Sequence, residues 1–241
     1  MPAILNQVVK ADCQLRSDGF EILTDVLPLE ECDQLANELS MLHQFKKASR
    51  RSKLGGLRNL LRMVPKVSEI ASLPRITDIL EARLHQKAFP VRALFFDKTP
   101  EANWSVAWHQ DLTIAVAKKI ETDGYTAWSV KEGVVHVQPP LAILQGMLAV
   151  RIHLDECRAE NGALKVVPGS HLRGVLRGDE ISDADCNSKS IIFEISKGGA
   201  LLMRPLLLHS SSPAQAPSHR RVLHLEYATE ELANSLRWFE N

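Results

Sequence analysis

Short runs of β-branched, aromatic and other apolar residues, separated by turn-forming residues, fill the chain from about residue 90 onward. Runs of this kind are typical of β-strands. Because few helix-length segments lie between them, they indicate an antiparallel sandwich or barrel and argue against a parallel, doubly wound sheet. We therefore expect a mainly β fold with flanking helices, of the double-stranded β-helix (jelly-roll, cupin-like barrel) type. The predicted strands span residues 91–96, 105–109, 147–154, 162–167, 190–195, 200–203 and 221–227.

The first third of the chain indicates helices instead. Residues 27–42 contain leucines at three- to four-residue spacing, and Pro28 and two glutamates come before these leucines in the chain. A proline at the start and acids in the first turn are typical of a helix N-terminus. Residues 76–85 predict a second helix.

Composition restricts the class of protein. The 241 residues include 29 basic and 29 acidic side chains, and this zero formal net charge argues against a dedicated nucleic-acid-binding protein. No apolar stretch is long enough for a membrane span, and the N-terminus lacks the features of a secretion signal. The four cysteines form no C-x-x-C pair, as expected of free thiols in a reducing compartment. We expect a cytoplasmic protein with one domain over residues 1–241, in which a helical part (about 1–89) packs on a β core (about 90–230).

Three histidines are each followed, two residues later, by a carboxylate. Residues i and i+2 of a strand project from the same face, so each pair can present a nitrogen and an oxygen to one metal ion. Arg151, His153 and Asp155 form the polar side of a predicted half-buried strand, which favours a structural role for His153 and Asp155. His109 instead ends a strand and leads into a long irregular segment, where a ligand can reach it. The pairs are His109 with Asp111, His153 with Asp155, and His224 with Glu226.

A third metal ligand has to come from a distant part of the chain. His209 closes the apolar run 206–208 and opens a turn of small residues, so it also lies at a strand end. Together with His109 and Asp111 it would form a set of two histidines and one carboxylate, which leaves positions free for a co-substrate and oxygen. This set suits redox iron better than the closed site of structural zinc.

Several motifs of the chain resemble those of the phytanoyl-CoA dioxygenase family of Fe(II)/2-oxoglutarate-dependent oxygenases. The resemblance rests on W-H-Q-D at 108–111, on E-N-G-A-L-K-V-V-P-G-S-H at 160–171, and on H-S-S at 209–211 followed by Arg220. It implies that His109, Asp111 and His209 bind the iron. It also implies that Arg220, with Ser211, binds the distal carboxylate of 2-oxoglutarate, since a guanidinium binds carboxylates in a bidentate manner.

The resemblance further implies the reaction. The expected enzyme is a 2-oxoglutarate-dependent dioxygenase that uses Fe(II) and O2, converts 2-oxoglutarate to succinate and CO2, and hydroxylates a small-molecule metabolite. Relatives that halogenate lack the carboxylate ligand, so Asp111 favours hydroxylation. The alternative is a non-catalytic, cupin-like protein that binds a metal or a small molecule, because residues 162–171 also resemble the second cupin motif.

Candidate substrate-binding residues lie around the expected metal site. Lys98 and Asn103 precede the strand of His109, and strand alternation places His224 on the same face as Arg220. Trp128 and Gln138 belong to the segment 117–140, which is either a lid or an inert surface loop. A basic stretch over residues 46–62 is compatible with an anionic substrate.

Overall fold

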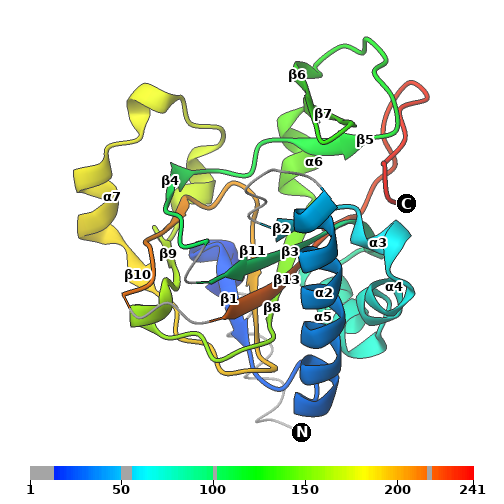
Figure 1. The fold of residues 1–241 in the computed structure, drawn as a ribbon. Helices are drawn as coiled ribbons and strands as arrows, with labels where there is room; N and C mark the ends of the chain where they lie inside the picture. Colours follow the sequence, from blue (N-terminus) through cyan, green and yellow to red (C-terminus); the bar gives the residue numbers. More distant parts are fainter. Residues whose placement is uncertain (1–13, 50–55, 100–101, 216–218) are drawn as a thin grey trace, which may run out of the picture.

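The computed structural model describes residues 14–49, 56–99, 102–215 and 219–241, and it consists mainly of β-sheets flanked by helices (Figure 1). Side chains are described outside residues 45–49. The expected fold class is confirmed. The helices are α2 (Leu29–Ser49), α3 (Leu60–Met63), α4 (Pro65–Ala71), α5 (Pro74–Leu84), α6 (Leu141–Gln145) and α7 (Asp183–Lys189), with short 3-10 turns η1 (Ala159–Asn161), η2 (Ser170–Arg173) and η3 (Gly178–Glu180).

The strands form three sheets. A six-stranded sheet has the order β1-β11-β8-β13-β3-β2, a four-stranded sheet the order β10-β9-β12-β4, and a three-stranded sheet the order β5-β7-β6. The printed strand pairs are antiparallel. The described strands form no closed barrel, since these sheets remain separate. Strand bounds are β1 (Phe20–Leu23), β2 (Gly56–Leu57), β3 (Phe89–Lys98), β4 (Val106–His109), β5 (Ile114–Val116), β6 (Thr126–Lys131), β7 (Val134–Gln138), β8 (Leu148–His153), β9 (Leu164–Val166), β10 (Ile191–Ile192), β11 (Ala200–Met203), β12 (His209–Ser211) and β13 (Arg220–Ala228).

One face of the six-stranded sheet packs against the helices α2 to α5, which lie along one side of the strands in Figure 1. Alternate residues of the central strands supply this face, among them Phe95 of β3, Ile152 of β8 and Leu223 of β13, all fully buried. Leu35 and Leu39 of α2 meet them from the helical side. Both predicted helices are present, and within the described part of the chain no helix is long and apolar enough to cross a membrane.

The other face of this sheet turns toward the four-stranded sheet. At one end the two sheets meet in a buried apolar cluster that includes Phe20 of β1, Leu164 of β9 and Leu201 of β11. Beyond that cluster the facing side chains become polar and enclose a cavity. The opening between the two sheets is therefore where the sequence-predicted site residues can converge.

The segment 117–140 was expected to be irregular, and that expectation is wrong. Its strands β6 and β7 form a hairpin that pairs with β5. The turn between them is Glu132–Gly133, whose φ values of 53° and 84° suit the tight turn of a two-residue hairpin. Val137 and Tyr125 are buried in an apolar cluster with Trp238, so the segment is an integral part of the core.

Candidate metal centre

The three predicted metal ligands converge at one end of the four-stranded sheet. His109 of β4 and His209 of β12 are direct partners in the antiparallel register, and their ring centroids are 4.1 Å apart. Asp111 follows β4, where its backbone N–H donates to the carbonyl of Pro205. One ligand atom from each of the three residues lies within 4.8 Å of the others. Nε2 of His109 lies 3.9 Å from Oδ1 of Asp111, and Nε2 of His209 lies 3.6 Å from Oδ2 of the same carboxylate.

Backbone carbonyls fix the orientation of both imidazoles. Nδ1 of His109 lies 2.8 Å from the carbonyl of Ala107, and Nδ1 of His209 lies 2.8 Å from the carbonyl of Leu207. A carbonyl can only accept, so Nδ1 carries the proton in each ring and Nε2 offers its lone pair toward Asp111. Burial lowers the pKa of His209 to about 4, which keeps that ring neutral at physiological pH. The three residues thus fit a divalent metal that prefers two nitrogens and a carboxylate on one side.

Gln110 fixes the loop that carries these ligands. Its side-chain NH₂ donates to the carbonyls of Gly174 and Leu206, at 2.8 and 2.7 Å, and its Oε1 accepts from the N–H of Leu176. The amide is buried and joins three segments that are far apart in the sequence. It therefore holds the two flanking residues, His109 and Asp111, in place.

The cavity in front of the triad has a volume of about 380 Å³, and the six-stranded sheet forms its floor. Strand register arranges the floor in cross-strand rows of β3, β13 and β8. The first row contains Arg92 and Glu226, the second Leu94, His224 and Arg151, the third Phe96, and the fourth Lys98 and Arg220. Val222 and His153 complete the third row beside Phe96 but do not line the cavity.

The fourth row contains the predicted co-substrate residue Arg220. Its guanidinium is 3 % exposed, lines the cavity, and has no hydrogen-bond partner at Nε and Nη1. Ser211 of β12 lies on the opposite wall of the same cavity. A buried guanidinium with unused donors is costly unless an anion binds it. This end of the cavity therefore fits a carboxylate.

Lys98 lies beside Arg220 in the same row. Its Nζ donates to Oγ of Ser211 at 3.1 Å and to the carbonyl of Ser212 at 2.6 Å. Burial, together with the charge of Arg220, lowers the pKa of Lys98 to about 7. The close approach depends on Gly162, which has a φ of 78° and where a Cβ would lie 2.8 Å from the carbonyl of Ser212.

Strand alternation separates Arg220 from its neighbour Arg221. Arg221 points to the helical side, where its Nε and Nη2 donate to Asp155 at 2.8 and 2.7 Å. The predicted faces of β13 are thus confirmed. An arginine on the face opposite to Arg220 could have pointed to solvent or to a partner, but Arg221 instead forms an ion pair with Asp155 within the chain.

The remaining candidates for substrate binding divide into two groups. His224 lines the cavity. Asn103, Trp128 and Gln138 are not among the residues that line it. The amide of Asn103 exchanges hydrogen bonds with the backbone of Ala214, Trp128 packs with the cluster of the three-stranded sheet, and Gln138 pairs with Thr126 in that sheet.

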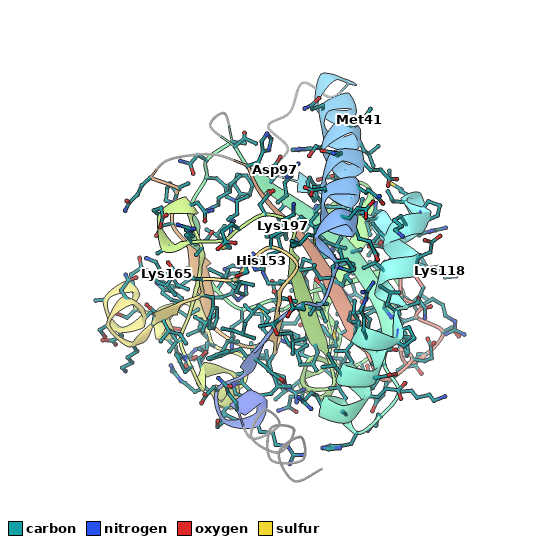
Figure 2. The ribbon with its side chains drawn as sticks, turned by 90° about the horizontal axis from the view of Figure 1, so that it is seen from below. Met41, Asp97, Lys118, His153, Lys165 and Lys197 are labelled. Carbon is teal, nitrogen blue, oxygen red and sulfur yellow. The ribbon has the colours of Figure 1, made fainter. Side chains whose placement is uncertain are left out.

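The sequence indicated Glu226 only as the partner of His224 in a possible metal-binding pair, and it did not place Arg151 at the site. Glu226 accepts from Arg92 at 3.1 Å, and although burial opposes ionisation, Arg92 and His224 keep the pKa of Glu226 below its usual value. Arg151 was assigned with His153 to a half-buried polar face; both are buried, and His153 lies near the middle of the molecule (Figure 2). Only the register of β8 against β13 shows that Arg151 faces the cavity.

The basic stretch 46–62 lies largely outside the described side chains. Within its described part, Arg58 lines the cavity entrance and forms an ion pair with Glu132 at 3.2 Å. Lys131 of β6 lines the same cavity. The three-stranded sheet therefore contributes a side chain to the site.

Solved structures with this fold are found at low sequence identity. AviO1 from Streptomyces viridochromogenes Tue57 shares 21 % identity over 91 % of this chain and 94 % of its own, with a TM-score of 0.65. EctD from S. alaskensis with bound Fe shares 17 % identity over 91 % of this chain and 76 % of its own, with a TM-score of 0.70. The epimerase SnoN was solved with Fe3+, alpha ketoglutarate and nogalamycin RO. It shares 15 % identity over 92 % of this chain and 84 % of its own, with a TM-score of 0.67. At these identities the likeness establishes the fold.

No curated protein matches the sequence. A family model does match it, namely that of phytanoyl-CoA dioxygenase, over residues 15–222. The match includes the triad, the fourth row of the cavity floor and the strands that position both. The chain belongs to the phytanoyl-CoA dioxygenase family.

Proposed function

We propose that this protein is an Fe(II)- and 2-oxoglutarate-dependent dioxygenase in which His109, Asp111 and His209 bind the iron. Arg220, assisted by Ser211 and Lys98, binds the distal carboxylate of 2-oxoglutarate. One observation carries the proposal: a cavity has a set of two nitrogens and one carboxylate on its wall and a buried guanidinium without a carboxylate partner on its floor. These are the two groups that a 2-oxo dicarboxylate bound to a metal requires.

Some side chains of the site bind the metal, and others position 2-oxoglutarate. When bound, the iron with 2-oxoglutarate and O2 supplies the oxidising chemistry. The two carbonyl-bound imidazoles keep their Nε2 atoms aimed at one point. The floor of the six-stranded sheet supports 2-oxoglutarate, and the walls exclude bulk water from the reacting centre.

We propose hydroxylation of a small molecule as the outcome. Relatives that halogenate lack the carboxylate ligand and bind a halide in its place. In this chain Asp111 occupies that ligand position, so no room is left there for a halide. The cavity volume of about 380 Å³ suits a small metabolite alongside 2-oxoglutarate. Lys131, which lines the cavity and donates to the hydroxyl of Thr113, favours an anionic substrate.

Succinate formation tests this function. Purified protein with Fe(II), ascorbate, O2 and 2-oxoglutarate should release succinate slowly without the primary substrate and faster once a true substrate is added. Arg220→Ala should reduce this release at subsaturating 2-oxoglutarate. Binding of metal and 2-oxoglutarate without any succinate would instead support the cupin-like binding protein.

A further inference from the structure

The floor of the cavity contains more positive charge than the proposed function uses. Arg92 is neutralised by Glu226, and Arg58 by Glu132. In the proposed function Arg220 binds the distal carboxylate of 2-oxoglutarate with the assistance of Lys98, the other buried cation of the fourth row. Among the described residues that line the cavity, this leaves Arg151 as a deeply buried cation for which no carboxylate partner is found.

Arg151 lies in the second row of the floor, two rows from Arg220. Its side chain is 8 % exposed. Nη1 donates to Nδ1 of His224 at 3.1 Å, and the guanidinium carbon is 5.6 Å from the ring centroid of Phe96. Nε has no hydrogen-bond partner among the described residues. Phe96 and His224 therefore orient the guanidinium without neutralising its charge.

The contact with His224 also fixes the tautomer of that ring. A guanidinium only donates, so Nδ1 of His224 accepts and its Nε2–H points to Oε1 of Glu226, 3.4 Å away. The carboxylate of Glu226 is thus shared by Arg92 and His224 and does not compensate Arg151. An isolated buried charge is retained at a cost to folding, and this cost is offset when an anion binds.

We propose that Arg151 is a second carboxylate-binding residue of this cavity, separate from Arg220. The rows of Arg151 and Arg220 are four residues apart along the strands, which is about 13 Å between their backbones. The two guanidinium groups thus start from different rows of the floor, so that a carboxylate held by Arg220 can leave Arg151 available for another. The second carboxylate comes from one of two sources, the 2-oxo acid end of 2-oxoglutarate or the primary substrate. This inference rests on the proposed function, because it assigns the first carboxylate to Arg220.

Binding measurements on protein loaded with Ni(II) in place of iron separate these sources without turnover. The variants are Arg151→Gln and Arg220→Gln, and the calorimetric probes are 2-oxoglutarate and 2-oxobutanoate, which lacks the distal carboxylate. If Arg151 binds the 2-oxo acid end, Arg151→Gln weakens both probes about tenfold or more, whereas Arg220→Gln weakens 2-oxoglutarate alone.

If the second carboxylate belongs to the primary substrate, a different result is expected. Arg151→Gln then leaves the affinity for 2-oxoglutarate within about twofold of wild type. It abolishes the binding of benzoate, followed by ligand-observed NMR, to protein already saturated with 2-oxoglutarate. Either result supports a carboxylate site at Arg151 and identifies its source. An Arg151→Gln variant that binds 2-oxoglutarate more weakly but 2-oxobutanoate like wild type would show that both arginines bind one carboxylate, and would overturn the inference.

Thermal unfolding of the metal-free protein distinguishes binding from a structural role. An anion-binding Arg151 leaves the ligand-free Arg151→Gln variant at least as stable as wild type, because an uncompensated buried charge is removed. If the variant is less stable and binds all three probes like wild type, Arg151 only supports His224 and the inference is overturned. If Arg220→Gln also leaves 2-oxoglutarate binding unchanged, the proposed function itself fails.

Arg151→Lys provides a second variant should Arg151→Gln fail to fold. It keeps the positive charge and loses the planar pair of donors, so the affected probe should bind about threefold to tenfold more weakly than to wild type. Wild-type affinity of Arg151→Lys for all three probes would contradict a bidentate carboxylate contact.

Discussion

His109 and His209 lie directly opposite each other in the β4–β12 pair, and each ring is fixed by the backbone carbonyl two residues before it in the chain. The backbone register alone therefore sets the distance between the two imidazoles. A shift of this register by one residue would turn one of the rings to the other face of the sheet. The four-stranded sheet is thus the scaffold of the proposed metal centre.

Gln110 should be needed for both stability and metal binding. Gln110→Ala leaves two carbonyls and one N–H without their partner in a buried site, and each unsatisfied group costs about 1–3 kcal/mol. We expect the free energy of unfolding to fall by about 2–4 kcal/mol in chemical denaturation, and the affinity for divalent metal to fall with it. The exposed Gln215→Ala serves as the control and should change stability by less than about 0.5 kcal/mol. Equal stability of the two variants would refute this role.

Arg220 and Arg221 should separate co-substrate binding from fold stability. Loss of a buried partner in a charged hydrogen bond costs roughly 2–5 kcal/mol, so Arg220→Ala should weaken 2-oxoglutarate by about 30-fold or more in calorimetry. Arg221→Ala should change that affinity by less than about fivefold. It should instead lower the free energy of unfolding by about 1–3 kcal/mol, because it leaves the partly buried Asp155 without its partner. The opposite pattern would show that the assignment of the two faces of β13 is wrong.

Glu240 should make stability depend on pH. It accepts from the N–H groups of Leu61 and Ala93, and burial raises its pKa from 4.5 to about 7. The folded protein thus binds this proton more tightly than the unfolded chain. The resulting stabilisation is complete below the unfolded pKa and is lost as the pH rises through about 7. Between about pH 5 and pH 8, Glu240→Gln should gain about 2–3 kcal/mol in unfolding free energy relative to wild type. Parallel pH profiles of the two proteins would contradict this assignment.

Period-two alternation in the sequence was sufficient to predict the two faces of β13. Leu223 and Leu225 bury their side chains against the helices, and residues of the other parity, such as Arg220 and His224, line the cavity. The strands predicted from local composition are also present, although β9 and β10 are shorter than their apolar runs. Local patterns determine these features because each strand has one apolar and one polar face.

Features that depend on distant pairing could not be predicted in the same way. Arg151 and His153 have the same alternation as any half-buried strand, and only the register of β8 against β13 shows that Arg151 lines the cavity while His153, one row further along, does not. The hairpin of β6 and β7 had a local signal in Glu132–Gly133, but Glu-Gly is a weaker turn signal than Asn-Gly or Asp-Gly. The apolar cluster around Trp238 that buries this hairpin comes from the end of the chain.

Anaerobic titration of Fe(II) into the protein with 2-oxoglutarate tests the central claim most directly. We expect one Fe(II) per chain and the weak visible charge-transfer band of 2-oxoglutarate chelated to ferrous iron. His109→Ala, Asp111→Ala and His209→Ala should each abolish the band, whereas His153→Ala, at a buried histidine that does not line the cavity, should retain it. Retention of the full band in His109→Ala and His209→Ala, with its loss in His153→Ala, would contradict the assignment of the metal centre.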